Sequence, residues 1–83
     1  MCYEKIFVKV IAEFNSVGGM RPTVIVWKDG ERFNIDKVKF IERAPCKSGG
    51  VLPIRFTVQV SGQTKFLYYE RAKERFFVER EVR

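Results

Sequence analysis

Apolar residues at every second position are the dominant pattern of this sequence, and the pattern first appears in residues 3–14. The apolar residues of one parity there are Ile6, Val8, Val10, Ala12 and Phe14, and Lys5, Lys9 and Glu13 alternate with them, joined by Phe7 and Ile11. A period of two indicates a β-strand, because successive side chains of a strand point to opposite faces. We therefore expect a long strand with one buried and one mixed face, followed by a loop at 15–19.

The clearest turn signal is the pair Asp29 and Gly30, which separates two apolar runs in residues 23–35. Asp-Gly favours a two-residue type I′ hairpin loop, because both central residues of that loop need a positive φ. With such a loop, Trp27 lies directly opposite Arg32. The predicted core face then consists of Val24, Val26, Phe33 and Ile35, and the other face of Ile25, Trp27, Arg32 and Asn34.

The parity of the apolar residues changes after this hairpin. Phe33 and Ile35 occupy odd positions, whereas Val38 and Phe40 occupy even ones. A strand changes parity only through an extra residue or a bend. We therefore expect a bulge or sharp corner near residues 36–37, after which Val38 and Phe40 rejoin the core.

A second hairpin follows the alternating run 54–60, with Ser61 and Gly62 at its turn. Its loop length decides which side chains share a face. A two-residue loop sets Val58 opposite Lys65, whereas an odd-numbered loop puts Phe66 on the face of Val58 and turns Lys65 outward. We expect the odd-numbered loop, with Gly62 in a left-handed conformation.

The remaining segments complete an all-β prediction. Residues 44–50 form a flexible loop, residues 70–75 a charged turn, and residues 76–80 a last strand, with a C-terminal helix over 70–82 as the competing interpretation. The result is one domain, residues 1–83, of about six short antiparallel strands. We expect a small, partly open barrel of SH3-like or OB-like shape.

The chemistry that is missing argues against an enzyme. The chain has no histidine, which is the commonest general base and metal ligand, and its only cysteines are Cys2 and Cys46. Two distant cysteines do not make a structural zinc site, and we expect both to be reduced thiols in a cytoplasmic protein. Residues 47–50, Lys-Ser-Gly-Gly, lack the upstream glycine of a phosphate-binding loop. We expect no catalytic residues, no metal and no cofactor.

No stretch reaches 18 uncharged apolar residues, so we expect no membrane-spanning helix, and the charged N-terminus does not resemble a signal peptide.

The net charge of +6 attracts polyanions such as nucleic acid. Exposed aromatic rings among cations are the surface that single-stranded nucleic acid uses. The candidate nucleic-acid-binding residues are Trp27, Lys28, Arg32, Lys37, Lys39, Arg43 and Arg55. In the competing interpretation, the 15–22 loop or the C-terminal segment covers Trp27 and makes a second small core.

Four segments of the chain resemble a family of small uncharacterised all-β proteins of Gram-positive bacteria. They begin at Trp27 (Trp-Lys-Asp-Gly), Ile35 (Ile-Asp-Lys-Val), Arg55 (Arg-Phe-Thr-Val) and Phe76 (Phe-Phe-Val-Glu). The resemblance spans most of the chain but implies no activity or site residue. The sequence thus leaves two hypotheses: a non-catalytic accessory domain that binds nucleic acid through a basic, aromatic face, or a protein-interaction module that uses a sheet edge or aromatic patch.

Overall fold

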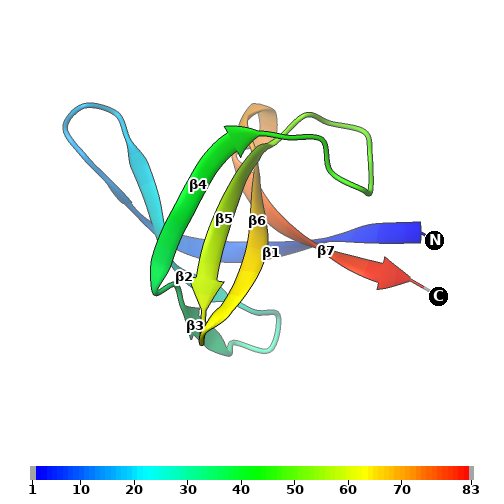
Figure 1. Cartoon of the computed structure of the whole chain (residues 1–83), viewed down its shortest axis with the longest axis horizontal. Helices are drawn as coiled ribbons and strands as arrows, with labels where there is room; N and C mark the ends of the chain where they lie inside the picture. The colour runs from blue at the N-terminus through cyan, green and yellow to red at the C-terminus, as the bar shows by residue number, and fades with distance from the viewer. Residues whose placement is uncertain (1, 83) are drawn as a thin grey trace.

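Seven antiparallel β-strands and one 3-10 turn make up the computed structural model, which describes residues 2–82 (Figure 1). The elements are β1 (Cys2–Phe14), β2 (Met20–Val26), β3 (Arg32–Asn34), β4 (Lys37–Arg43), β5 (Ile54–Val60), β6 (Gln63–Glu70), η1 (Arg71–Lys73) and β7 (Arg75–Val82). The strand order is β3-β2-β1-β7-β6-β5-β4, and the sheet curls into a half-barrel. The all-β prediction is confirmed, with one strand more than the six or so expected.

The long strand β1 connects the two parts of the half-barrel. Its residues 2–8 pair with β7 and its residues 9–14 pair with β2. The end of β1 that carries the N-terminus and the end of β7 that carries the C-terminus extend together as a two-stranded ribbon (Figure 1). No helix among residues 2–82 is long and apolar enough to cross a membrane.

The core lies on the face of the sheet that we call the inner face. It is a buried cluster of Ile25, Phe56, Val58, Val60, Leu67 and Phe76, with partly buried Val8, Val10, Phe33, Ile35, Val38 and Val78 packed against it. Val58 and Leu67 have no exposed surface. The opposite side of the sheet is the outer face.

The first hairpin has a three-residue loop, so its predicted register is wrong. The N–H of Trp27 donates to the carbonyl of Glu31 (2.8 Å), and Ile25 pairs with Phe33. The Asp29 carboxylate accepts a hydrogen bond from the N–H of Glu31 (2.8 Å), which stabilises the longer loop. Residues 24–27 are therefore on the faces opposite to those predicted: Ile25 is buried in the core, in place of Val24 and Val26. Phe33 packs against the core as expected.

The second hairpin has a two-residue loop, so the expected odd-numbered loop is wrong as well. Ser61 and Gly62 both have positive φ values, 50° and 78°, and Val58 pairs with Lys65. Ser61 tolerates this conformation because its N–H donates to the Asp36 carboxylate (3.1 Å) on the neighbouring corner. The left-handed Gly62 is confirmed.

The corner between β3 and β4 is confirmed at residues 35–36, and Val38 packs against the core beyond it. A bulge that the sequence analysis did not predict follows at once. Val38 pairs with Val58 but Phe40 pairs with Thr57, which leaves Lys39 as the extra residue. The bulge reverses the parity again, so the prediction that Phe40 rejoins the core is wrong.

The C-terminal prediction of a strand is confirmed by β7, and the charged turn before it contains η1. Both cysteines are free thiols; Cys2 is exposed and Cys46 is buried. Cys46 belongs to the 44–53 connection, which packs on the outer face over Tyr68 and Phe77. This connection is fixed to the terminal ribbon, because Lys5 donates to the Gly49 carbonyl (2.6 Å).

Candidate nucleic-acid interface

Two exposed phenylalanines lie in one row across the outer face of β4, β5 and β6. Phe40 is 66% exposed and Phe66 is 47% exposed. Both are direct cross-strand neighbours of Thr57, because Phe40 pairs with Thr57 and Thr57 pairs with Phe66. The row Phe40–Thr57–Phe66 therefore presents two aromatic rings on the same side of the sheet, separated by one small side chain.

Three cations border this row. The guanidinium of Arg55 lies over the Phe66 ring, 4.6 Å from its centroid. Lys39 Nζ donates to Thr64 Oγ1 (3.0 Å), so the bulge residue reaches across the same face. Lys37 pairs with Gln59 in the next row of the same face. We call Phe40, Phe66, Lys37, Lys39 and Arg55 together the platform.

Arg55 is held in place by Glu42, at 2.5 Å from its Nη2. The pair is partly exposed, so its contribution to stability is small. Its effect is positional: the carboxylate keeps the guanidinium on the Phe66 ring. The hydrogen bond with Glu42 also raises the pKa of Arg55.

The outer face next to the platform is covered. Tyr68 stacks on Phe77 at 5.2 Å between ring centroids, and the 44–53 connection buries both rings. The backbone N–H of Ser48 donates to the Glu79 carboxylate. Burial alone would raise the pKa of Glu79, but hydrogen bonds from Ser48 and from the Lys47 backbone outweigh it and lower the pKa. Burial raises the pKa of the Tyr68 phenol, and the Glu79 charge adds to this rise.

The other predicted site residues do not join the platform. Trp27 is half-buried on the inner face, so it is neither displayed nor fully covered. Arg32 pairs with Val26, so the prediction that it lies directly opposite Trp27 is wrong. Lys28 is exposed in the hairpin loop, and Arg43 is exposed at the end of β4, opposite Ile54.

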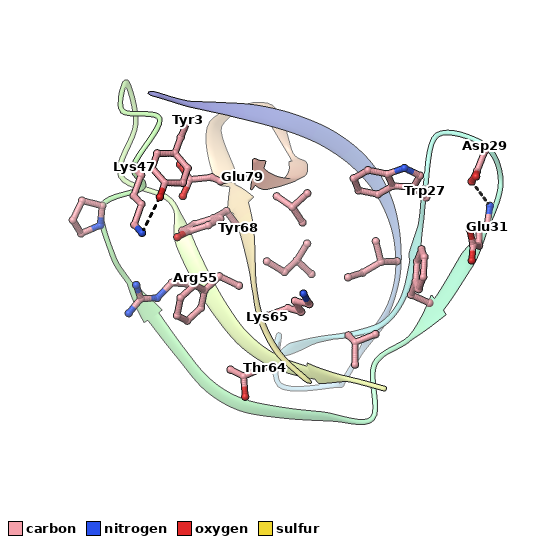
Figure 2. A pocket seen from close by; sticks show the side chains of 17 residues that line it. Tyr3, Trp27, Asp29, Glu31, Lys47, Arg55, Thr64, Lys65, Tyr68 and Glu79 are labelled. Atoms are coloured by element: carbon pink, nitrogen blue, oxygen red, sulfur yellow. Dashed lines mark hydrogen bonds between the residues drawn. The ribbon is translucent and has the colours of Figure 1, made fainter. Parts of the chain in front are cut away.

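A cavity of about 670 Å³ opens beside β6, and Trp27 lines it. Trp27 lies on one side of this cavity, and Tyr68, Arg55 and Lys47 lie on the other (Figure 2). The lining also includes apolar residues of the inner face, namely Ile25, Phe33, Val60, Leu67 and Val78. Among residues 2–82, no three His, Cys, Asp or Glu side chains come together in a way that could hold a metal ion.

The sequence analysis missed both aromatic residues of the platform because it assigned them to the core. A signal was present in each case. Phe40 is followed by Ile41, and Phe66 is followed by Leu67. In a strand, only one residue of such an adjacent pair faces the core. The sequence therefore required one apolar side chain on the outer face at each place, and this side chain is exposed where no segment covers that face.

Comparisons of the chain with protein-family models, with curated proteins and with solved structures find no match.

Proposed function

We propose that this protein is a non-catalytic accessory domain that binds single-stranded nucleic acid on the platform of Phe40, Phe66, Lys37, Lys39 and Arg55. The observation that carries the proposal is the pair of exposed rings in one row of the sheet, bordered by three cations. Three of the seven residues expected from the sequence belong to this platform, although Trp27 does not.

The two rings supply the stacking surfaces. Cross-strand neighbours have Cβ atoms about 5 Å apart, so two such steps separate Phe40 from Phe66 by about 10 Å. Thr57 between them is small enough to leave both rings accessible. Stacking of a base on an aromatic side chain contributes about 1–3 kcal/mol and tolerates every base, because each base has a π-face. We therefore expect affinity for single strands with little sequence preference.

The cations supply the contacts to phosphate. Among residues 2–82, neither Lys37 nor Lys39 forms an ion pair, so both ammonium groups remain available to an anion. Arg55 is compensated by Glu42 and contributes mainly through its position on the Phe66 ring. Small OB-like barrels also bind single strands on the face of their sheet, and the platform on β4–β6 would use the half-barrel in a comparable way. A cytoplasmic location belongs to the same proposal.

The proposal is tested by titrating the protein with fluorescein-labelled oligothymidylate and oligouridylate at several salt concentrations and measuring anisotropy. Phe40→Ala and Phe66→Ala should each weaken binding about 5- to 150-fold, which corresponds to the loss of about 1–3 kcal/mol. Phe14→Ala is the matched control, because Phe14 is 74% exposed at the far end of β1. If Phe14→Ala weakened binding as much as Phe40→Ala, the platform would not be the binding surface.

The lysines are tested through the salt dependence. On single strands, the logarithm of the binding constant falls with the logarithm of salt by about 0.7 per phosphate neutralised. Lys39→Gln should therefore reduce this slope by about 0.7, whereas Lys73→Gln in η1 should leave it unchanged. Equal effects of the two substitutions would show that net charge alone, and not the platform, attracts the oligonucleotide.

A further inference from the structure

β6 and β7 separate from each other partway along their length. They pair only between residues 68–70 of β6 and 75–77 of β7. Beyond this point residues 63–67 of β6 pair with β5 alone, and residues 78–82 of β7 pair with β1 alone. Among residues 2–82, no other strand lies between β6 and β7. The sheet therefore has an internal gap with a free strand edge on each side, which we call the β6–β7 opening.

The cavity beside β6 lies at this opening and is lined by residues of both strands that border it. Its lining includes four consecutive residues of β6, namely Thr64, Lys65, Phe66 and Leu67, and two consecutive residues of β7, Val78 and Glu79. A cavity over a sheet face would be lined by every second residue of a strand, because side chains alternate between the faces. Consecutive lining residues indicate that the cavity reaches the edges of both strands. Lys65 of β6 lies between Arg55 and Trp27 in this cavity (Figure 2).

The register of the second hairpin shows which backbone groups lie at the edge of β6. In a two-residue hairpin, Val60 and Gln63 form a hydrogen-bonded pair, and hydrogen-bonded pairs alternate along an antiparallel ladder. Lys65 and Leu67 therefore direct their N–H and C=O groups toward β5. Thr64 and Phe66 direct theirs toward the opening. A row of free backbone donors and acceptors is a template for a further strand.

The inner side of the opening favours apolar side chains. Ile25, Trp27, Leu67 and Val78 line the cavity there. An extended peptide placed on the β6 edge would direct every second side chain against these residues. The charged residues of the cavity lining are balanced, with Lys47, Arg55 and Lys65 beside Asp29, Glu31 and Glu79. The net charge of +6 on the whole chain therefore supplies the preference for acidic residues at the other positions of the peptide.

We propose that the β6–β7 opening binds an extended peptide segment of a partner protein, which adds to the free edge of β6 as an antiparallel strand. Backbone hydrogen bonds to Thr64 and Phe66 hold the segment, and large apolar side chains at its alternate positions contact Trp27. This binding site borders the platform, because Arg55 and Phe66 line the cavity as well. It differs from the platform in using the backbone edge of β6 and the inner side of the sheet rather than the rings on the outer face.

The first test uses a blocked peptide of alternating glutamate and valine with a central phenylalanine. Trp27 is the only tryptophan, so its fluorescence reports binding directly. The control is the same peptide with its alternate amides N-methylated on the side that faces β6, which removes the backbone donors and keeps charge and composition. We expect the parent peptide to shift the Trp27 emission to shorter wavelength and the N-methylated peptide to bind at least tenfold more weakly. Equal binding of the two peptides, or no binding of the parent peptide at millimolar concentration, would overturn the proposal.

The second test blocks the edge of the protein. Thr64→Pro removes an N–H that points into the opening, so the fold should tolerate it, whereas Lys65→Pro removes an N–H that bonds to β5 and should lower the melting temperature. We expect Thr64→Pro to keep the wild-type melting temperature and to lose at least tenfold in peptide affinity. Retained peptide affinity would show that the peptide does not bind this edge, and unfolding of Thr64→Pro would show that the edge is not free; either result would overturn the proposal.

Hydrogen exchange on the wild-type protein gives a measurement that needs no variant. Saturating peptide should slow exchange at the amides of Thr64 and Phe66 and leave the amide of Lys65 unchanged. Unchanged exchange at Thr64 and Phe66 would overturn the strand addition. Peptide binding, measured on Phe40→Ala, separates the two proposals, because Phe40 is a platform ring that does not line the cavity and its loss should leave the edge of β6 in place.

Discussion

Replacing Phe77 by alanine tests most directly which aromatic residues of the outer face are buried and which are exposed. Phe77 has no exposed surface, stacks on Tyr68 at 5.2 Å and meets Phe7 edge-to-face at 5.7 Å between ring centroids. A buried Phe→Ala substitution costs about 3–5 kcal/mol, and each aromatic pair contributes about 0.5–1.5 kcal/mol beyond its buried area. We therefore expect a loss in the upper part of this range, about 4–5 kcal/mol, for Phe77→Ala.

Such a loss is close to the whole stability of a small domain, which lies at the low end of the usual range of roughly 5–15 kcal/mol. In a chain of this size it corresponds to a melting temperature lower by roughly 15–40 °C. Phe40→Ala is the matched comparison, because the same side chain is removed from an exposed position; it should change the free energy of unfolding by no more than about 0.5 kcal/mol.

The assay is urea denaturation followed by far-ultraviolet circular dichroism, with Phe77→Leu as a milder variant in case Phe77→Ala does not fold. Phe77→Leu keeps most of the buried volume but loses both ring contacts, so it should still be measurably less stable than Phe40→Ala. If Phe40→Ala cost as much as the Phe77 variants, Phe40 would be a core residue, and the platform with its proposed function would not exist.

Three further predictions concern separate parts of the chain. Glu79→Gln should lower stability at neutral pH. The folded-state pKa of Glu79 is lowered from 4.5, so the carboxylate stabilises the fold above that pH, and this stabilisation is lost as the pH falls through the folded-state pKa. The urea midpoints of the wild type and Glu79→Gln should therefore converge in acid, and a difference between the midpoints that stays the same at every pH would contradict this. Ser61→Asn should raise the free energy of unfolding by roughly 0.5–1 kcal/mol, because asparagine adopts the positive φ of 50° more readily, and a destabilised variant would argue against the type I′ loop. A maleimide reagent should modify exposed Cys2 rapidly in the native protein and buried Cys46 only on unfolding; equal rates in mass spectrometry would show that the 44–53 connection does not pack as described.

The elements of the fold could be predicted from the sequence because they depend on local patterns. The alternation in 3–14, the corner at 35–36 and the strand over β7 each follow from apolar parity and turn residues, and the structure confirms all three. The faces could not be predicted in the same way. An antiparallel strand with apolar residues of both parities, such as β2 with Val24 and Ile25, fits either register, and the choice then depends on the loop.

Loop length is the quantity that the sequence left undetermined. Asp29 and Gly30 are compatible with loops of two or three residues, and the longer loop forms because the Asp29 carboxylate caps the N–H of Glu31. Ser61 is an uncommon residue for a positive φ, and its conformation depends on Asp36, a residue 25 positions away in the chain. Both decisive contacts involve side chains whose geometry no periodicity of apolar residues encodes.

The two mispredicted loop lengths also explain why the candidate site contains Phe40 and Phe66 in place of the predicted Trp27. One additional residue in the first loop places Trp27 on the inner face, and the two-residue second loop places Phe66 on the outer face. The bulge at Lys39 then exposes Phe40 beside it and brings the lysine to the same face. Each change is a shift by one residue, and in a sheet such a shift moves a side chain from the core to the surface. Cations stand next to both rings in the sequence, at Lys39 and Lys65, but only Lys39 reaches the outer face. The side chain of Lys65 shares the face of Val58, so the charge next to Phe66 on the platform comes from Arg55 on the neighbouring strand.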